Sequence, residues 1–171
     1  MSKSFAMMIA TALTLGVTNA APAAALGPEA AACRAGAAQP SVLVHVDGFK
    51  TRTGSVRVQV YGSNPDDFLA KGRKLKRIDL PVTKAGPMDV CVRLPNPGDY
   101  AIAVRHDVDG TGKSGWSDGG GFSRNPRLSL FALKPKYRDV VIAVGPGTKP
   151  VPVVLNYRDG LTIRPVAMSA L

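Results

Sequence analysis

The stretch GSVRVQVYGS, residues 54–63, is the clearest indicator of the fold. Within it, Val56, Val58 and Val60 alternate with polar or aromatic residues. Successive side chains of a β-strand point to opposite faces, so this period of two predicts a strand with one buried face. The run SVLVHVDGF (41–49) precedes it, and turn-forming residues separate the two. Together the two runs predict a β-hairpin.

Similar runs recur along the rest of the chain. Further strands are predicted at KRIDLPV (76–82), MDVCVRL (88–94), DYAIAVRH (99–106), RDVVIAV (138–144), VPVVLNY (151–157) and, as an edge strand, LTIRPV (161–166). NPDDFLAKGRKL (64–75) predicts one or two helical turns, because Asn64 is a good N-cap and Pro65 suits the first helical position. Short strands joined by turn residues predict an all-β fold. We expect one antiparallel Greek-key β-sandwich of about seven to eight strands over residues 41–166, with one short helix and a long Gly/Asp-rich loop.

The N-terminal residues predict an exported protein. Lys3 precedes the apolar run 5–17, and small residues follow, which is the pattern of a secretory signal peptide at residues 1–25, cleaved after Ala20 or Ala25. Residues 26–40 are rich in Ala, Pro and Gly and predict a tether. The apolar run is shorter than the roughly 20 residues that span a bilayer, so no transmembrane segment is expected in the mature chain. The predicted location is the periplasm or the medium.

The two cysteines, Cys33 and Cys91, predict a disulfide, because an exported protein folds in an oxidising compartment. Cys91 lies on the face of its strand opposite Met88, Val90 and Val92. A disulfide from this position is expected to hold the N-terminal tether across the outer face of the sheet.

The chain is strongly basic, with 22 Lys and Arg against 12 Asp and Glu and a formal net charge of +10. Such a charge favours anionic partners, and for an exported protein these are an envelope polymer or a lipid surface. The densest basic cluster, residues 71–77, has no interleaved aromatic residues. Nucleic acid is therefore not an expected partner.

The stretch DVDGTGKSGW (107–116) allows two interpretations. GTGKS resembles the end of a phosphate-binding loop, but that motif needs Gly where Asp107 stands, and its carboxylate would repel phosphates. The glycine-rich residues that follow also cannot begin a stable helix. The phosphate-loop interpretation is therefore rejected.

The second interpretation is a calcium loop. The twelve-residue pattern of a calcium-binding loop requires oxygen ligands at positions 1, 3, 5, 9 and 12, a backbone carbonyl at position 7 and Gly at position 6. The candidate metal ligands are Asp107, Asp109, Thr111, the Lys113 carbonyl and Asp118, with Gly112 at the required position. The alternative is that Asp and Gly form an ordinary polar turn. Calcium is thus a candidate cofactor, and none other is expected.

Three residues near this loop are candidate ligand contacts. His106 precedes the loop on the strand face of Tyr100 and Ile102, and we interpret it as capping the core edge through a hydrogen bond rather than as a catalytic base. Trp116 and Phe122 flank the glycine-rich segment, where two interpretations stand: they form a surface on which sugars stack, or, as such aromatics do more often, they fold back to anchor their own loop. No nucleophile elbow or Cys-His pair stands out, so an enzyme is not expected.

The run LPNPGDYAIAVRHDVDGTGKSGWSDGGGFSRNP (94–126) resembles the exported bacterial proteins grouped as domain-of-unknown-function family 2141. The matching motifs are a Pro-Gly-x-Tyr turn into a strand, His106-Asp107 followed by Asp and Gly, and Gly-Phe-Ser-x-Asn at 121–125. Here GWSDGG replaces the longer segment that the family usually carries before Gly-Phe-Ser. The resemblance implies an exported β-sandwich, distantly similar to transthyretin-like and carboxypeptidase-regulatory domains, and supplies no reaction.

Three functions follow as hypotheses. The first is a non-enzymatic, envelope-associated module with the loop at 107–118 ordered by its acidic residues, with or without calcium. The second is a binder of carbohydrate or envelope polymer through Trp116 and Phe122. The third, which we favour least, is a hydrolase centred on His106 and Asp107.

Overall fold

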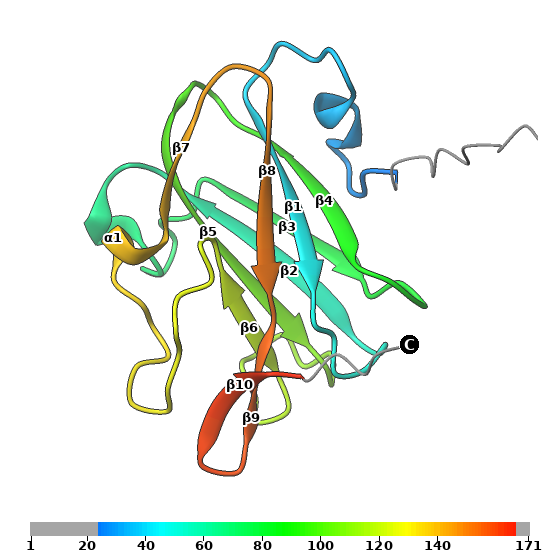
Figure 1. Cartoon of the computed structure of the whole chain (residues 1–171), viewed down its shortest axis with the longest axis vertical. Coiled ribbons are helices and arrows are strands. Elements are labelled where there is room, and N and C mark those ends of the chain that lie inside the picture. The colour runs from blue at the N-terminus through cyan, green and yellow to red at the C-terminus, as the bar shows by residue number, and fades with distance from the viewer. Residues whose placement is uncertain (1–23, 167–171) are drawn as a thin grey trace, which may run out of the picture.

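The alternating runs of the sequence form two β-sheets that pack face to face (Figure 1). This computed structural model describes residues 24–166. Its strands are β1 (Ser41–Asp47), β2 (Ser55–Tyr61), β3 (Lys76–Pro81), β4 (Met88–Arg93), β5 (Gly98–Asp107), β6 (Gly119–Phe122), β7 (Val141–Val144), β8 (Thr148–Val154), β9 (Asn156–Asp159) and β10 (Thr162–Pro165). The helical elements are η1 (Ala30–Cys33), η2 (Pro65–Asp67) and α1 (Tyr137–Val140). The prediction of an all-β sandwich is confirmed, and the described residues contain more strands than predicted.

The smaller sheet has the order β4-β1-β8, and the larger has the order β10-β9-β6-β5-β2-β3, with β7 also pairing with β5. All pairs are antiparallel except β1 with β8, which run parallel. The expectation of a purely antiparallel sandwich was therefore wrong at this pair. The predicted hairpin of residues 41–63 was also wrong, because β1 and β2 lie in different sheets. Their valines meet across the core, and turn residues alone cannot distinguish a hairpin from a crossover between layers.

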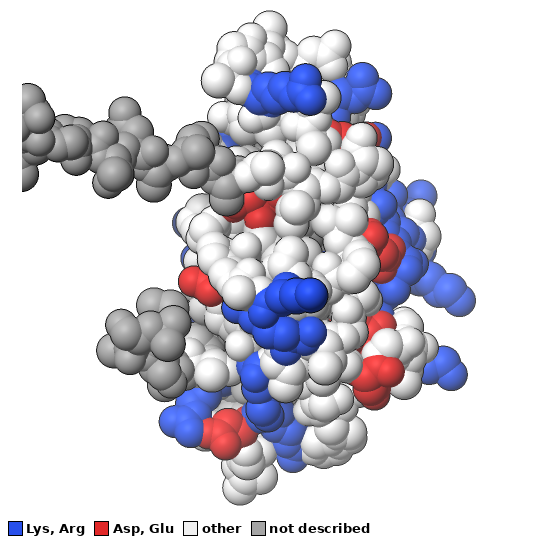
Figure 2. All heavy atoms as spheres, turned by 90° about the vertical axis from the view of Figure 1, so that its right-hand side faces the viewer, with Lys and Arg blue, Asp and Glu red and all other residues white. Residues whose placement is uncertain are grey.

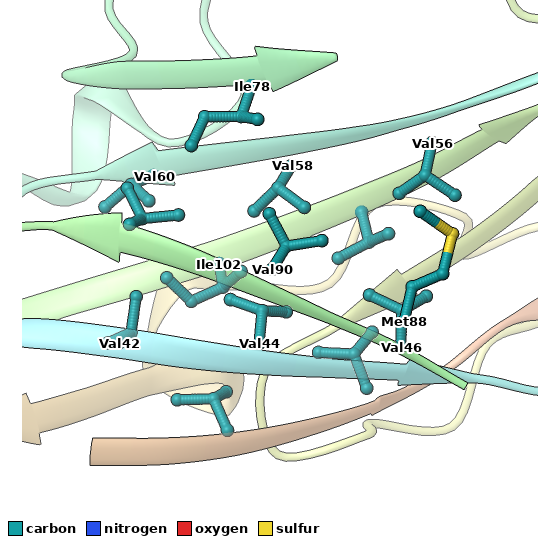
Figure 3. Close-up of a cluster of buried hydrophobic side chains, with 14 of the residues drawn as sticks. Val42, Val44, Val46, Val56, Val58, Val60, Ile78, Met88, Val90 and Ile102 are labelled. Atoms are coloured by element: carbon teal, nitrogen blue, oxygen red, sulfur yellow. The ribbon is translucent and has the colours of Figure 1, made fainter. Parts of the chain in front are cut away.

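The core lies between the two sheets and is built mainly from valines (Figure 3). Val42, Val44 and Val46 of β1 are fully buried, and they face the equivalent stripe of β2. Burying a valine contributes roughly 1.5–3 kcal/mol relative to leaving it exposed. Repeated over these stripes, that gain fixes the register, since a slip by one residue would turn every valine outwards.

The predicted helical turn in residues 64–75 is confirmed as the single 3-10 turn η2, which begins at Pro65 and which Asn64 caps by accepting a hydrogen bond from the Asp66 backbone N–H. Three other local features need correction. The run 138–144 begins as the helical turn α1 before it becomes β7, and the run 151–157 divides between β8 and β9. Strand β6, with the sequence GGGF, was missed because consecutive glycines usually indicate a loop.

The segment predicted as a tether packs against the smaller sheet. Leu26 forms a parallel bridge to Val90, with hydrogen bonds to the backbone of Asp89 and Cys91. The Glu29 carboxylate accepts hydrogen bonds from Lys76 Nζ at 2.6 Å and from the Arg93 backbone N–H at 2.8 Å. These contacts hold the pKa of Glu29 below its usual value against the opposing effect of burial. Within residues 26–40 the chain is therefore a docked cover rather than a free linker.

The Cys33–Cys91 disulfide fastens this cover, as predicted from the sequence. Cys91 is fully buried although it faces away from the main core, because η1 lies over it. Replacing both cysteines with alanine should lower the free energy of unfolding by about 2–4 kcal/mol, because the cross-link spans 58 residues of the unfolded chain. Urea unfolding of the oxidised protein measures this difference, and the reduced wild-type protein should match the variant. Equal midpoints for oxidised protein and variant would contradict the prediction.

The predicted signal peptide, residues 1–25, falls almost entirely outside the described residues. In the part of the chain that the structure describes, every helix is too short to cross a membrane.

Candidate functional site

The loop between β5 and β6 brings together the acidic residues that the sequence singled out. Strands β5 and β6 are antiparallel, and His106 pairs with Gly119. The next residue outwards on each strand is acidic, so Asp107 and Asp118 meet across the mouth of the loop. Asp109 joins them, and the three side chains offer carboxylate oxygens that all lie within 4.8 Å of one another.

Each carboxylate also stabilises the loop. Asp107 Oδ2 accepts a hydrogen bond from the Gly112 backbone N–H at 2.8 Å, and Asp109 Oδ1 accepts one from the Thr111 N–H at 3.1 Å. Asp118 accepts from the N–H groups of Val108 and Gly115, with one oxygen each. Hydrogen bonds from Thr111 lower the pKa of Asp109, so this carboxylate is ionised at neutral pH.

Asp107 differs from the other two because it is buried, with 2% of its surface exposed. Its Oδ1 atom has no hydrogen-bond partner among the described residues. The Arg105 guanidinium lies 3.2 Å from Oδ2 and also donates to Ser114 Oγ at 3.3 Å. Arg105 therefore balances part of the negative charge from the sheet side and leaves Oδ1 unpaired. A buried carboxylate oxygen without a partner is costly, unless a cation or water binds it.

The remaining two predicted ligands lie in the same loop but bond to each other. Thr111 Oγ1 donates to the Lys113 carbonyl at 3.3 Å, and the Lys113 N–H donates back to Thr111 Oγ1 at 3.4 Å. To bind an ion, Thr111 Oγ1 and the Lys113 carbonyl oxygen would have to give up the hydrogen bond between them. The geometry thus brings together the three carboxylates and leaves Thr111 and Lys113 engaged with each other.

One glycine that was not identified as a site residue fixes how closely the loop approaches the turn before β2. Gly54 has a positive φ of 73°, and a Cβ there would lie 1.9 Å from the Asp107 carbonyl oxygen. A Cβ on Gly115, by contrast, would meet Asp109 Oδ2 and Asp118 Oδ2 at the ordinary contact distances of 3.6 and 3.8 Å. The Gly54 contact joins segments that are distant in the sequence, so turn propensity alone could not reveal it.

His106 is fully buried beneath the loop. Its Nε2 atom lies 2.8 Å from the Thr53 carbonyl, so it carries the proton, and Nδ1 accepts from the Tyr157 hydroxyl at 2.6 Å. Burial raises the pKa of Tyr157 to about 12, which keeps the phenol protonated as the donor. The predicted hydrogen-bonding role of His106 agrees with this geometry, and neither ring nitrogen is free to act as a base.

The two aromatic candidates do not form one surface. Phe122 is 8% exposed and packs in a second apolar cluster with Tyr61, facing away from the main core. Trp116 is 75% exposed, and the Arg158 guanidinium stacks 3.4 Å from its ring centroid. The interpretation of the two aromatics as one stacking surface is therefore wrong, and Phe122 instead anchors its own segment, which was the other interpretation.

Comparison with known proteins agrees with the resemblance noted from residues 94–126. No curated protein and no solved structure matches the chain. A family model does match residues 44–151, which run from within β1 through β7, include the acidic loop and end in the first part of β8. The chain belongs to the bacterial family described as "Uncharacterized protein conserved in bacteria (DUF2141)".

Proposed function

We propose that this protein is an exported, non-enzymatic, envelope-associated module whose β5–β6 loop binds a calcium ion. The observation that carries the proposal is the unpaired Oδ1 atom of buried Asp107, which lies beside two further carboxylates. A buried carboxylate oxygen without a hydrogen-bond donor supports cation binding at this position.

The donor set suits calcium better than the other common ions. Calcium is a hard cation that accepts six to eight oxygen ligands in flexible geometry. Asp107, Asp109 and Asp118 would supply carboxylate oxygens, and Thr111 and the Lys113 carbonyl are neutral oxygens nearby in the loop. The group contains neither sulfur nor imidazole, which zinc and copper prefer. We expect the millimolar to submillimolar affinity that is usual for extracellular calcium modules.

The experiment is thermal unfolding of the oxidised protein in EDTA and in calcium. Calcium that binds only the folded state raises stability by about 2.7 kcal/mol at a hundred times its dissociation constant, which is a rise of several degrees in midpoint. Asp107→Asn keeps the shape of the side chain but removes its charge, and it should abolish the rise. Asp139→Asn removes a carboxylate outside the loop and should leave the rise unchanged.

Two results would contradict the proposal. One is a wild-type midpoint that stays unchanged as calcium is raised to about a hundred times the expected dissociation constant, and the other is a rise that persists in Asp107→Asn. Magnesium provides a further comparison, since it demands octahedral geometry and releases water reluctantly. A larger rise with magnesium than with calcium would point to a different ion.

A further inference from the structure

A second feature of the surface lies away from the acidic loop, in the connection from β6 to β7. Phe131, near the middle of this connection, is fully exposed, and Leu133 is 51% exposed. Figure 1 shows the connection (yellow) projecting from the body of the sandwich beside α1. Large apolar side chains exposed together mark an interaction site more often than a single one does.

The tip of this connection has a defined backbone. Ser129 and Ala132 form an antiparallel bridge with hydrogen bonds in both directions, and Leu130 and Phe131 lie between them. The backbone groups of Ser129 and Ala132 therefore already have partners. Such a turn can enter a low-dielectric environment without leaving these groups unsatisfied.

Both ends of the connection are fixed to the sandwich. Asn125 Oδ1 accepts from the Val154 backbone N–H at 2.8 Å, and Arg124 donates to the Arg138 carbonyl at 3.0 Å. Leu128 and Tyr137 pack against the second apolar cluster. The tip is thus presented by a supported base, so little ordering is needed when it meets a partner.

The charge of this segment is wholly positive. Residues 124–138, which we name the basic loop, contain no acidic residue. Its exposed cations are Arg124, Arg127, Lys134, Lys136 and Arg138. On the face of the molecule in Figure 2, by contrast, blue basic and red acidic side chains are interspersed. The basic loop therefore combines an apolar tip with a concentration of positive charge, in which only Arg138 has an acidic partner among the described residues, Asp139 at 3.8 Å.

We propose that the basic loop docks on the surface of an anionic lipid bilayer, with Phe131 and Leu133 entering the boundary between headgroups and acyl chains. Its cations then contact lipid phosphates, since long basic side chains keep their charges at the polar surface while their stems lie along apolar groups. An anionic polymer would satisfy the cations but would offer nothing apolar to Phe131. The exposed apolar tip is therefore the reason for proposing a lipid bilayer rather than a polymer as the partner.

The test is co-sedimentation of the full oxidised chain with vesicles, in EDTA so that calcium plays no part. Wild-type protein should bind phosphatidylcholine vesicles that contain phosphatidylglycerol, and bind pure phosphatidylcholine far less. Phe131→Ser should weaken binding roughly tenfold through lost apolar burial. Arg127→Gln with Lys134→Gln should weaken it by tenfold or more.

Matched controls separate the loop from general surface properties. Leu161→Ser removes an apolar side chain that is 84% exposed elsewhere, and Lys71→Gln with Lys84→Gln makes the same change in net charge. Both should bind vesicles as wild type does. With a soluble anionic polymer such as dextran sulfate, Phe131→Ser should bind like wild type, because the polymer engages only the cations.

Three outcomes would overturn the proposal. The first is unchanged vesicle binding in Phe131→Ser. The second is an equal loss in the control variants, which would show that net charge or exposed apolar surface acts without regard to position. The third is that the protein does not bind vesicles and instead self-associates through Phe131. Sedimentation would then show an oligomer for wild type and a monomer for Phe131→Ser. Because calcium is absent from the assay, none of these results depends on the proposed calcium site.

Discussion

Gly54→Ala is expected to lower the free energy of unfolding by about 3 kcal/mol or more. The new Cβ would lie 1.9 Å from the Asp107 carbonyl oxygen and 2.9 Å from the Val108 carbonyl oxygen. Both are backbone atoms, so no side chain can rotate away. The left-handed φ of 73° adds roughly 1–2 kcal/mol for any residue with a Cβ.

Urea unfolding measures this loss, and Gly72→Ala is the matched control. Gly72 has a similar φ of 81°, but among the described residues nothing lies within 4 Å of a Cβ built there. Its substitution should cost only the backbone strain, roughly 1–2 kcal/mol. If the two variants lose equal stability, the close approach of Gly54 to Asp107 is not the cause. Because the contact involves Asp107, the Gly54 variant should also lose any calcium response that the wild type shows.

The layout of the sandwich could be predicted from the sequence where one face of a strand is apolar. The alternation of Val56, Val58 and Val60 gave a correct strand, and the alternation in β4 correctly placed Cys91 away from the main core. The pairing of the strands could not be predicted in the same way. The pairing of β1 with β4 and β8 depends on contacts over 40 or more positions in the chain, and alternation carries no information about the neighbour.

The acidic cluster could also be predicted, because a known ligand spacing picked out Asp107, Asp109 and Asp118. Its surroundings could be predicted only in part. Arg105 lies two residues before Asp107 on the same face of β5, so alternation already places the two side chains together, whereas the hydrogen bond from Arg105 to Ser114 depends on how the loop folds back. Phe122 illustrates the opposite error, since an aromatic beside glycines resembled an exposed ligand contact. Those glycines instead belong to a strand that packs closely, and Phe122 lies in an apolar cluster beneath Phe68 and Tyr61.

The second large effect is expected for Gly119→Ala, in strand β6. A Cβ on Gly119 would lie 2.4 Å from Tyr157 Cε1 and 2.5 Å from Tyr157 Cζ, so the ring must move. Overpacking of this kind costs about 1–3 kcal/mol, and the displaced hydroxyl would also leave His106 Nδ1, at a further 1–3 kcal/mol. We therefore expect unfolding by urea at a clearly lower midpoint.

Gly120→Ala is the natural control, because it lies on the same strand with its nearest contact 3.8 Å away at the Val104 carbonyl. An alanine there should be neutral or slightly stabilising, since it restricts the unfolded chain. A double-mutant cycle then tests the cause: in a Tyr157→Ala background the ring is gone, so Gly119→Ala should cost little. If Gly119→Ala is as harmful without the ring as with it, the requirement for glycine arises from the β6 backbone. In that case the contact with Tyr157 would not explain why glycine stands at position 119.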